Sequence, residues 1–263
     1  MKILFIGDIV GKPGRKAVKE ILPRLKRENN IFLTIANGEN LAGGIGITPD
    51  VAQEIRSYGV DVITTGNHVW RRKEIERYLN EVDYILRPSN YPPGNPGKGH
   101  LVLIKEDIKI AVINLCGRIF MGDFVNIDCP FRTVGSLLKK FENELSIIIV
   151  DIHAEATSEK SAMGWYLDGR VSAVLGTHTH VQTSDERILP QKTAYITDVG
   201  MVGSIDSILG VKKEKVIKML LTQRPVSFTV EKKNIVLNSV IIELDEKTGE
   251  ALSIKRVNIP FNI

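Results

Sequence analysis

The first third of the chain alternates short apolar runs, typical of buried strands, with amphipathic segments whose apolar residues recur at helical spacing. Strands are predicted at residues 3–6, 32–36 and 60–64, and helices at 15–27, from 48 onwards and at 73–79. Thr48 and Pro49 suit the N-cap and first turn of the second helix. Pro23 interrupts the first helix and predicts a kink or a break there. This alternation of strands and helices favours a parallel sheet.

After residue 87 the pattern becomes richer in strands. A long loop of Pro, Gly and Asn residues at 88–99 precedes two apolar runs, 101–105 and 109–115, that predict a β-hairpin. Further strands are predicted at 147–152, 171–175, 226–231, 235–244 and 251–258, with a helix between the first two of these. No repeat, low-complexity segment or linker divides the sequence. We therefore expect a single domain, residues 1–263, built on two packed sheets with helices outside them.

Composition is that of an ordinary globular protein and narrows the function classes. Of 263 residues, 43% are hydrophobic and 25% charged, and no apolar run approaches the roughly 20 residues that a membrane span needs. The apolar start of the chain meets Asp8 too soon for a signal sequence, so we expect a cytoplasmic protein with no membrane partner. Cys116 and Cys129 are expected to be free thiols. The net charge of +4, without a basic stripe interleaved with aromatic residues, leaves RNA open as a partner without indicating it.

Side chains of metal-ligand type follow five of the predicted strands. They are Asp8, then Glu39 with Asn40, then Asn67 with His68, then Asp151 with His153, and finally His178 with His180. In open α/β sheets the loops at the carboxyl ends of the strands converge on one crevice, so these groups can meet although they are far apart in sequence. Four of the five histidines of the chain lie in these loops, and only His100 lies elsewhere.

Each of these segments also has a purely structural interpretation. Asp8 could cap the following helix, Glu39 and Asn40 could satisfy a turn, and Asn67 could occupy a left-handed turn position. His153 could be a hydrogen-bonded core histidine. The pair His178 and His180 is the least readily explained in this way, because a His-x-His pair at a strand end presents two nitrogen ligands to one small volume.

Two metal ions that share one carboxylate are the chemistry that fits the whole set. Glu39 is predicted to bridge them, because it is the only carboxylate in its loop. The donors are oxygen and nitrogen without thiolate, which suits iron, manganese, cobalt or zinc. Two cations about 3.5–4 Å apart can clamp a phosphoryl group and activate a bridging water, as hydroxide, for in-line attack on phosphorus.

The residues in these loops resemble the signature of the calcineurin-like metallophosphoesterase superfamily, and longer phrases resemble its YmdB-like branch. Those phrases are residues 7–11, 38–40, 65–68, 114–115, 153–160 and 197–201. Two departures stand out from the wider superfamily. Val10 stands where the first motif usually has a histidine, and Glu39 stands where the second usually has a bridging aspartate. The amide oxygen of Asn40 is expected to replace the missing imidazole.

The resemblance implies a ligand set, a fold and an activity. One ion would be held by Asp8, Glu39, Asn40 and His180, and the other by Glu39, Asn67, His153 and His178. His68 would be catalytic and act on the substrate, by stabilising phosphoryl charge or protonating the leaving oxygen. The implied protein is a homo-oligomeric four-layer α/β/β/α sandwich that acts as a phosphodiesterase on cyclic nucleotides, above all 2′,3′-cyclic nucleotides. The implied metal is iron or manganese, with zinc as an alternative.

The sequence has features of two other classes of protein. Residues 7–13 superficially resemble the phosphate-binding loop of an NTPase or kinase, but the glycine spacing is one residue short and Pro13 replaces the required Ser or Thr. A non-catalytic, metal-binding regulatory protein of the same fold stays open. The roles of several further side chains also stay open between phosphate or metal-site contacts and plain structure: Trp70, Arg71, Arg72, Arg118 and Asp198. The glycines at 43, 44 and 46 predict either a lid or an ordinary flexible loop.

Overall fold

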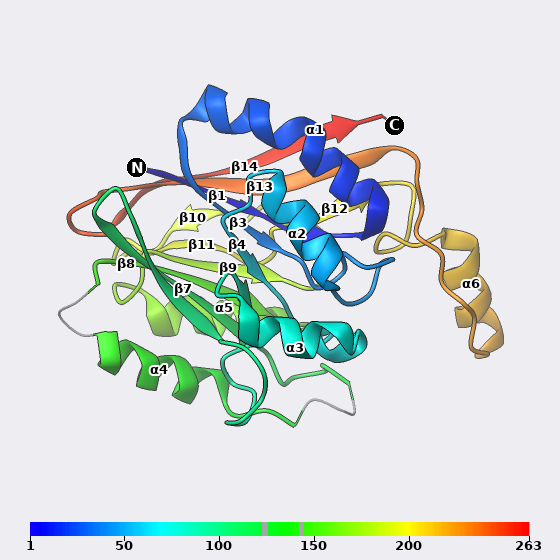
Figure 1. The fold of residues 1–263 in the computed structure, drawn as a ribbon, viewed down its shortest axis with the longest axis horizontal. Coiled ribbons are helices and arrows are strands. Elements are labelled where there is room, and N and C mark those ends of the chain that lie inside the picture. The colour runs from blue at the N-terminus through cyan, green and yellow to red at the C-terminus, as the bar shows by residue number, and fades with distance from the viewer. Residues whose placement is uncertain (123–125, 142–144, 263) are drawn as a thin grey trace.

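The computed structural model describes residues 1–122, 126–141 and 145–262. Over these residues the chain forms two β-sheets that pack face to face, with helices on the outer side of each sheet (Figure 1). This arrangement confirms the four-layer α/β/β/α sandwich expected from the sequence. Within the same residues, no helix combines the length and the apolar character that crossing a bilayer would take.

The first sheet is mixed. Its parallel strands lie in the order β1 (Lys2–Ile6), β3 (Ile31–Asn37), β4 (Val62–Thr64) and β5 (Ile85–Leu86). On the other side of β1 come antiparallel β13 (Ile235–Leu244), its neighbours β14 (Ala251–Phe261) and β12 (Met201–Ser204), and β2 (Asp8–Ile9) beside β12. The last two long strands therefore extend the sheet that the first strand begins.

The second sheet is mostly parallel. Its order is β10 (Arg187–Ile188), β11 (Ala194–Ile196), β9 (Ala173–Thr177), β8 (Ile147–His153), β7 (Ile108–Cys116) and β6 (His100–Lys105). The strands β11, β9, β8 and β7 run parallel, which gives them a common carboxyl edge. The antiparallel pairing of β6 with β7 confirms the predicted hairpin.

The helices cover the outer faces of the two sheets. Against the first sheet lie α1 (Gly11–Asn29), α2 (Pro49–Ser57), the short 3₁₀ helix η1 (Val69–Arg71) and α3 (Glu74–Glu81). Against the second lie α4 (Pro130–Phe141) and α5 (Thr157–Leu167). The helix α6 (Lys213–Thr222) stands apart from both sheets at one end of the molecule (Figure 1).

Three apolar layers hold the sandwich together. The side chains of a buried strand alternate between two of these layers. In β1, Ile3 and Phe5 pack between the two sheets, whereas Leu4 and Ile6 pack under the helices of the first sheet. Successive side chains of a strand point to opposite faces, so a strand that is buried on both sides must be apolar at every position. Each fully buried Leu, Ile or Phe contributes about 1.5–3 kcal/mol, which makes these layers the main source of stability.

Several local predictions were wrong. The break that was one of the two outcomes predicted at Pro23 does not occur, because its ring lies on the exposed side of α1, where water can bond the backbone carbonyl that the proline leaves unpaired. Residues 226–231 form no strand, and Val230 makes only an isolated bridge to Val211. Their alternation reflects apolar residues that line a cavity, as described below, and not a sheet ladder. The helices α4 and α6 and the strands β2, β5, β10, β11 and β12 were not predicted.

Candidate metal centre

The candidate ligands come from the carboxyl ends of strands in both sheets. Asp8 follows β1, Glu39 and Asn40 follow β3, and Asn67 follows β4 in the first sheet. In the second sheet His153 is the last residue of β8, and His178 and His180 follow β9. Because these strands are parallel within each sheet and the sheets face each other, their ends meet at one edge of the sandwich.

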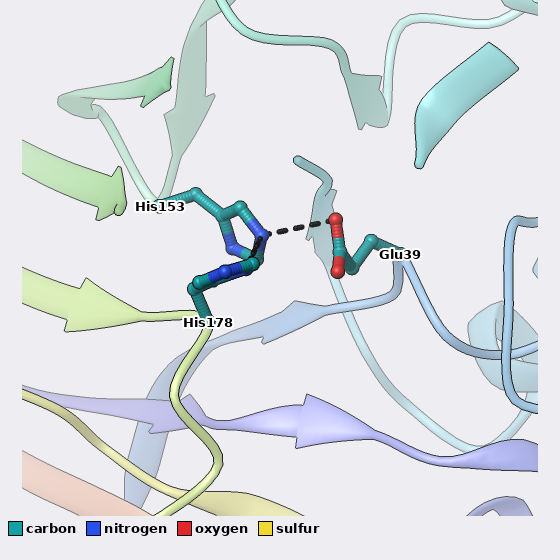
Figure 2. Close-up of side chains that lie close together, drawn as sticks. All are labelled: Glu39, His153 and His178. Carbon is teal, nitrogen blue, oxygen red and sulfur yellow. Dashed lines mark hydrogen bonds and ion pairs between the residues drawn. The ribbon is translucent and has the colours of Figure 1, made fainter. Parts of the chain in front are cut away.

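Glu39, His153 and His178 form the tightest group. One ligand atom from each lies within 4.8 Å of the others. The Nε2 atom of His153 is 3.0 Å from Glu39 Oε2 and 3.0 Å from His178 Nδ1, and Figure 2 shows the two imidazoles side by side with His153 directed at the carboxylate. Glu39 and His153 are fully buried, whereas His178 keeps 19% of its side chain exposed. A small cation between these atoms would find one oxygen and two nitrogen donors.

Asp8, Asn40 and His180 lie beside this group. The Nε2 atom of His180 is 3.1 Å from Asn40 Nδ2 and 3.7 Å from Asp8 Oδ1. Asn40 also donates to Glu39 Oε1 at 3.2 Å, so Glu39 contacts both groups. The structure thus joins six of the seven predicted ligands in one continuous chain of contacts, and the seventh is Asn67. The assignment of individual ligands to two ions stays a prediction.

Of the six buried side-chain oxygen atoms that lack a hydrogen-bond partner in the described part of the chain, two belong to predicted ligands. They are Oδ1 of Asp8 and Oδ1 of Asn67. Burial of an unsatisfied polar oxygen costs about 1–3 kcal/mol, so such atoms call for a partner. Burial also raises the pKa of Asp8 well above its usual value, with Glu39 and Asp198 adding to the effect. Both oxygens and the nearby imidazoles fit divalent cations as their missing partners.

Crowding of charge also marks the centre. Although burial alone would lower it, the carboxylates of Glu39 and Asp8 raise the pKa of His153 to about 9. Burial and the neighbouring His153 lower the pKa of His178 to about 3. Although burial opposes it, His153 and His68 hold the pKa of Glu39 well below its usual value. A protonated imidazole here takes the place of positive charge that bound cations would supply.

The loop that carries His178 and His180 has a strained backbone. Their φ angles are 102° and 64°, a region that non-glycine residues rarely adopt. Between them Thr179 is clamped by Asp198, whose Oδ2 accepts from the Thr179 amide at 3.1 Å and from its hydroxyl at 2.7 Å. Asp198 is in turn paired with the buried ammonium of Lys160 at 2.8 Å. Asp198 therefore satisfies the turn and fixes the loop, and it contacts Thr179 instead of an imidazole.

A buried polar network behind His153 was not predicted. His153 Nδ1 is 2.9 Å from the hydroxyl of Thr177, and that hydroxyl donates to Asp151 Oδ1 at 2.7 Å. Asp151 also accepts from Thr64 and Asn37, and its burial raises its pKa to about 6. The network holds the ring so that Nε2 faces the centre, a common arrangement for metal-binding histidines. The one feature of the sequence that could have indicated this network is the presence of polar residues inside otherwise apolar strands.

Gly66 allows the loop after β4 to approach the centre. A Cβ atom at this position would lie 2.1 Å from His153 Cδ2 and 2.3 Å from Glu39 Oε2. Real Cβ contacts are essentially never this short, so any side chain at residue 66 would displace the two proposed ligands. The position therefore requires glycine for close packing and not for its backbone angles.

His68 contacts the centre on the side that faces a cavity. Its Nδ1 atom is 3.1 Å from Glu39 Oε1 and 3.3 Å from Asn40 Oδ1, and 24% of its side chain is exposed. A cavity of about 610 Å³ opens at this point, and among its lining residues are Glu39, Asn40, His68, His178 and His180. A substrate in this cavity would reach the cluster and His68 together.

Of the other candidate side chains, Trp70 and Arg72 have structural contacts. Trp70 packs edge-on against Tyr91, with ring centroids 5.6 Å apart. Arg72 donates to the carbonyls of Ala42 and Ile45 and so braces the glycine-rich loop. Arg118 lines a different cavity, of about 500 Å³, and its backbone amide donates to Glu159. Cys116 and Cys129 are free, as predicted, and His100 packs against Phe141.

The four-layer sandwich with this cluster at its strand ends is of the metallophosphoesterase-like class. The family model described as YmdB-like protein matches residues 4–257. The chain is 49% identical, over 98% of its own length and 97% of the relative's, to a Bacillus subtilis protein named 2′,3′-cyclic-nucleotide 2′-phosphodiesterase. The protein belongs to the YmdB-like family, which confirms the resemblance noted in the sequence.

Solved structures agree over nearly the whole chain. A hypothetical protein from Thermus thermophilus superposes with a TM-score of 0.92 and 41% identity, covering 99% of each chain. A structure titled as a novel phosphatase of Mycoplasma pneumoniae superposes with a TM-score of 0.94 and 34% identity, covering 100% of this chain and 94% of that one.

Proposed function

We propose that this protein is a phosphodiesterase that hydrolyses cyclic nucleotides with the help of two divalent cations, and that 2′,3′-cyclic nucleotides are its preferred substrates. The observation that carries the proposal is the convergence of Glu39, His153 and His178 within 4.8 Å, beside Asp8, Asn40 and His180, at the floor of an open cavity. The name of the Bacillus subtilis relative supports the substrate class.

Both cations would be held by the oxygen and nitrogen donors described above, with Glu39 shared between them. Asp8, Asn40 and His180 would complete one site, and Asn67, His153 and His178 the other. The absence of thiolate from this set suits iron or manganese, with zinc as an alternative. When bound, two such cations neutralise phosphoryl charge and lower the pKa of a water molecule positioned beside phosphorus.

The residues of the chain supply orientation and proton transfer. Glu39 and Asn40 hold the ring of His68 through its Nδ1 atom, and the side chain of His68 borders the cavity. A histidine in that position can stabilise the oxygen that leaves phosphorus, or give it a proton. The buried network of Thr177 and Asp151 keeps His153 in one ring orientation. Little covalent chemistry is then required of the protein beyond positioning.

We also propose that residues 1–263 act as one domain. The tail strand β13 pairs with β1 over residues 2–6, so the two ends of the chain share one sheet. Removing residues 235–262 would expose β1 and the apolar layer between the sheets, and we expect that truncation to prevent folding.

Turnover and metal content of a single matched pair of variants test the proposed function. The purified protein is freed of metal by chelation, reloaded with Fe(II), Mn(II) or Zn(II), and assayed on 2′,3′- and 3′,5′-cyclic nucleotides. Glu39→Gln keeps the size of the side chain but removes the shared charge. We expect it to lower the metal content of the protein, and to lower kcat/KM at least about 100-fold. Glu81→Gln makes the same change at an exposed surface pair and is expected to have no effect.

Two results would contradict the proposal. Full activity of Glu39→Gln would remove the shared carboxylate from the reaction. Metal binding without turnover of any cyclic nucleotide would instead favour a non-catalytic, metal-binding regulatory protein.

A further inference from the structure

The cavity over the metal centre has two chemically different ends. Beside the polar cluster, a wall of apolar side chains faces the same space. We call these side chains the apolar wall: Ile208, Leu209, Val211, Val216, Met219 and Phe228. They come from the turn after β12, from α6 and from the segment that follows α6. A phosphate group would contact only the polar lining residues. The apolar wall would therefore contact a different part of the ligand.

The apolar wall is fixed relative to the metal centre. The carbonyl of Leu209 lies 3.1 Å from Nδ1 of His180, so one backbone group joins the wall to a proposed ligand. Val211 bridges Val230, and the Lys212 amide donates to the Thr229 carbonyl at 2.8 Å. These contacts tie the two segments of the wall to each other and to the centre. A group that rests on the wall would therefore lie at a set distance from phosphorus.

Phe228 is the one aromatic residue of the apolar wall. Half of its surface is exposed although it is a large apolar side chain, and it borders the cavity. An exposed aromatic face that borders a ligand cavity can stack a planar base, and such stacking tolerates any base because every base has a π-face. The wall side chains carry no strong hydrogen-bonding groups, so they cannot read the edge of a base.

We propose that the apolar wall binds the nucleobase of the substrate, with Phe228 stacking on it, and that it accepts purines and pyrimidines alike. This inference rests on the proposed function, because it assumes that phosphorus binds at the metal centre. It makes Phe228 a specificity-determining residue that separates nucleotides from phosphodiesters without a base. An apolar pocket discriminates weakly among its occupants, so we expect adenosine and uridine substrates to differ by less than about tenfold in kcat/KM.

The test compares substrates with and without a base. The metal-loaded protein is assayed on adenosine 2′,3′-cyclic phosphate, uridine 2′,3′-cyclic phosphate and glycerol 1,2-cyclic phosphate. Phe228→Ala removes the ring, and Phe228→Leu keeps apolar bulk without an aromatic face. Leu221→Ala is the matched control, because Leu221 lies on α6 but is 80% exposed and does not line the cavity. Thermal unfolding of each variant shows that the fold is intact.

We expect Phe228→Ala to lower kcat/KM for both nucleotides by roughly 5- to 100-fold, mainly through KM, which is the loss expected for one base–aromatic stack. Phe228→Leu is expected to show part of that loss, and Leu221→Ala none. Turnover of glycerol 1,2-cyclic phosphate should be the same in all four proteins. Equal losses on all three substrates, or no loss on the nucleotides, would overturn the inference.

A binding measurement separates this inference from the proposed function. Adenosine alone is titrated against the wild type and Phe228→Ala by calorimetry, which needs no turnover. Binding to the wild type that Phe228→Ala weakens supports the apolar wall as a base site even if no phosphodiester is cleaved. Absence of adenosine binding at millimolar concentration would overturn the inference, while turnover of the cyclic phosphates would leave the proposed function standing.

Discussion

Replacing Lys160 with Met should test whether its ion pair with Asp198 stabilises the loop that carries His178 and His180. The ammonium of Lys160 lies 2.8 Å from Asp198 Oδ2, and the two side chains are 1% and 0% exposed. Met keeps much of the apolar stem but removes the charge. Asp198 would then be a buried carboxylate without its counter-charge, while still clamping Thr179 between His178 and His180.

The structure sets the expected size of the effect. Removing one partner of a buried ion pair costs about 3–5 kcal/mol, because the other charge is left uncompensated. Asp198 would keep hydrogen bonds from the Thr179 amide, the Thr179 hydroxyl and the Gly200 amide, and these partly stabilise the remaining carboxylate. We therefore expect Lys160→Met to lower the free energy of unfolding by about 3 kcal/mol, at the lower end of that range.

Urea unfolding of the metal-free protein measures the effect, and a double-mutant cycle isolates it. Asp198→Asn removes the charge of the partner but keeps an amide oxygen that can accept from Thr179. The double variant leaves no unpaired charge, so we expect a coupling energy of about 2 kcal/mol. Arg77→Met is the control, because it breaks an exposed pair with Glu81 and should cost less than about 1 kcal/mol.

A small effect would refute this reasoning. If Lys160→Met costs less than about 1 kcal/mol and the coupling is near zero, the buried pair does not stabilise the loop. The expected loss should also appear in metal binding, because Asp198 without its counter-charge would hold the loop less firmly at His178 and His180, whose φ angles are 102° and 64°.

Three further predictions concern the metal centre. Gly66→Ala should abolish metal binding, because its Cβ would lie 2.1 Å from His153 Cδ2 and 2.3 Å from Glu39 Oε2; full metal content by elemental analysis would contradict this. Thr177→Val should weaken metal affinity roughly 10- to 100-fold in a calorimetric titration, because it breaks the link between His153 and Asp151, and unchanged affinity would count against the network. Although burial opposes it, Glu39 raises the pKa of His153 from 6.5 to about 9 in the metal-free protein, so the fold binds this proton more tightly than the unfolded chain does. That stabilisation is complete below pH 6.5 and lost as pH rises through about 9, and urea unfolding at several pH values should show the fall, whereas stability that does not decline over this range would argue against a protonated His153.

The sequence by itself determined the layers of the fold and the chemistry available at the strand ends. Apolar runs such as 3–6 and 147–152 had to be buried on both faces, and their order along the chain favoured parallel strands. Glu39, His178 and His180 could be singled out because donor side chains that directly follow such runs are placed by sheet geometry, which is a local property of the pattern. The prediction failed at 226–231, where alternation arose from a cavity wall instead of a ladder.

Only the tertiary structure decided which groups act on one another. The pairing of Lys160 with Asp198, the link from Thr177 to Asp151, and the tie between His180 and the Leu209 carbonyl each join segments that the pattern treats separately. Phe228 gave no chemical signal in the sequence, yet the fold sets it in the same cavity as the metal centre. The physical reason is that hydrophobic periodicity reports burial along one element, whereas hydrogen bonds, ion pairs and cavities depend on distances between elements that come together only when the chain is packed.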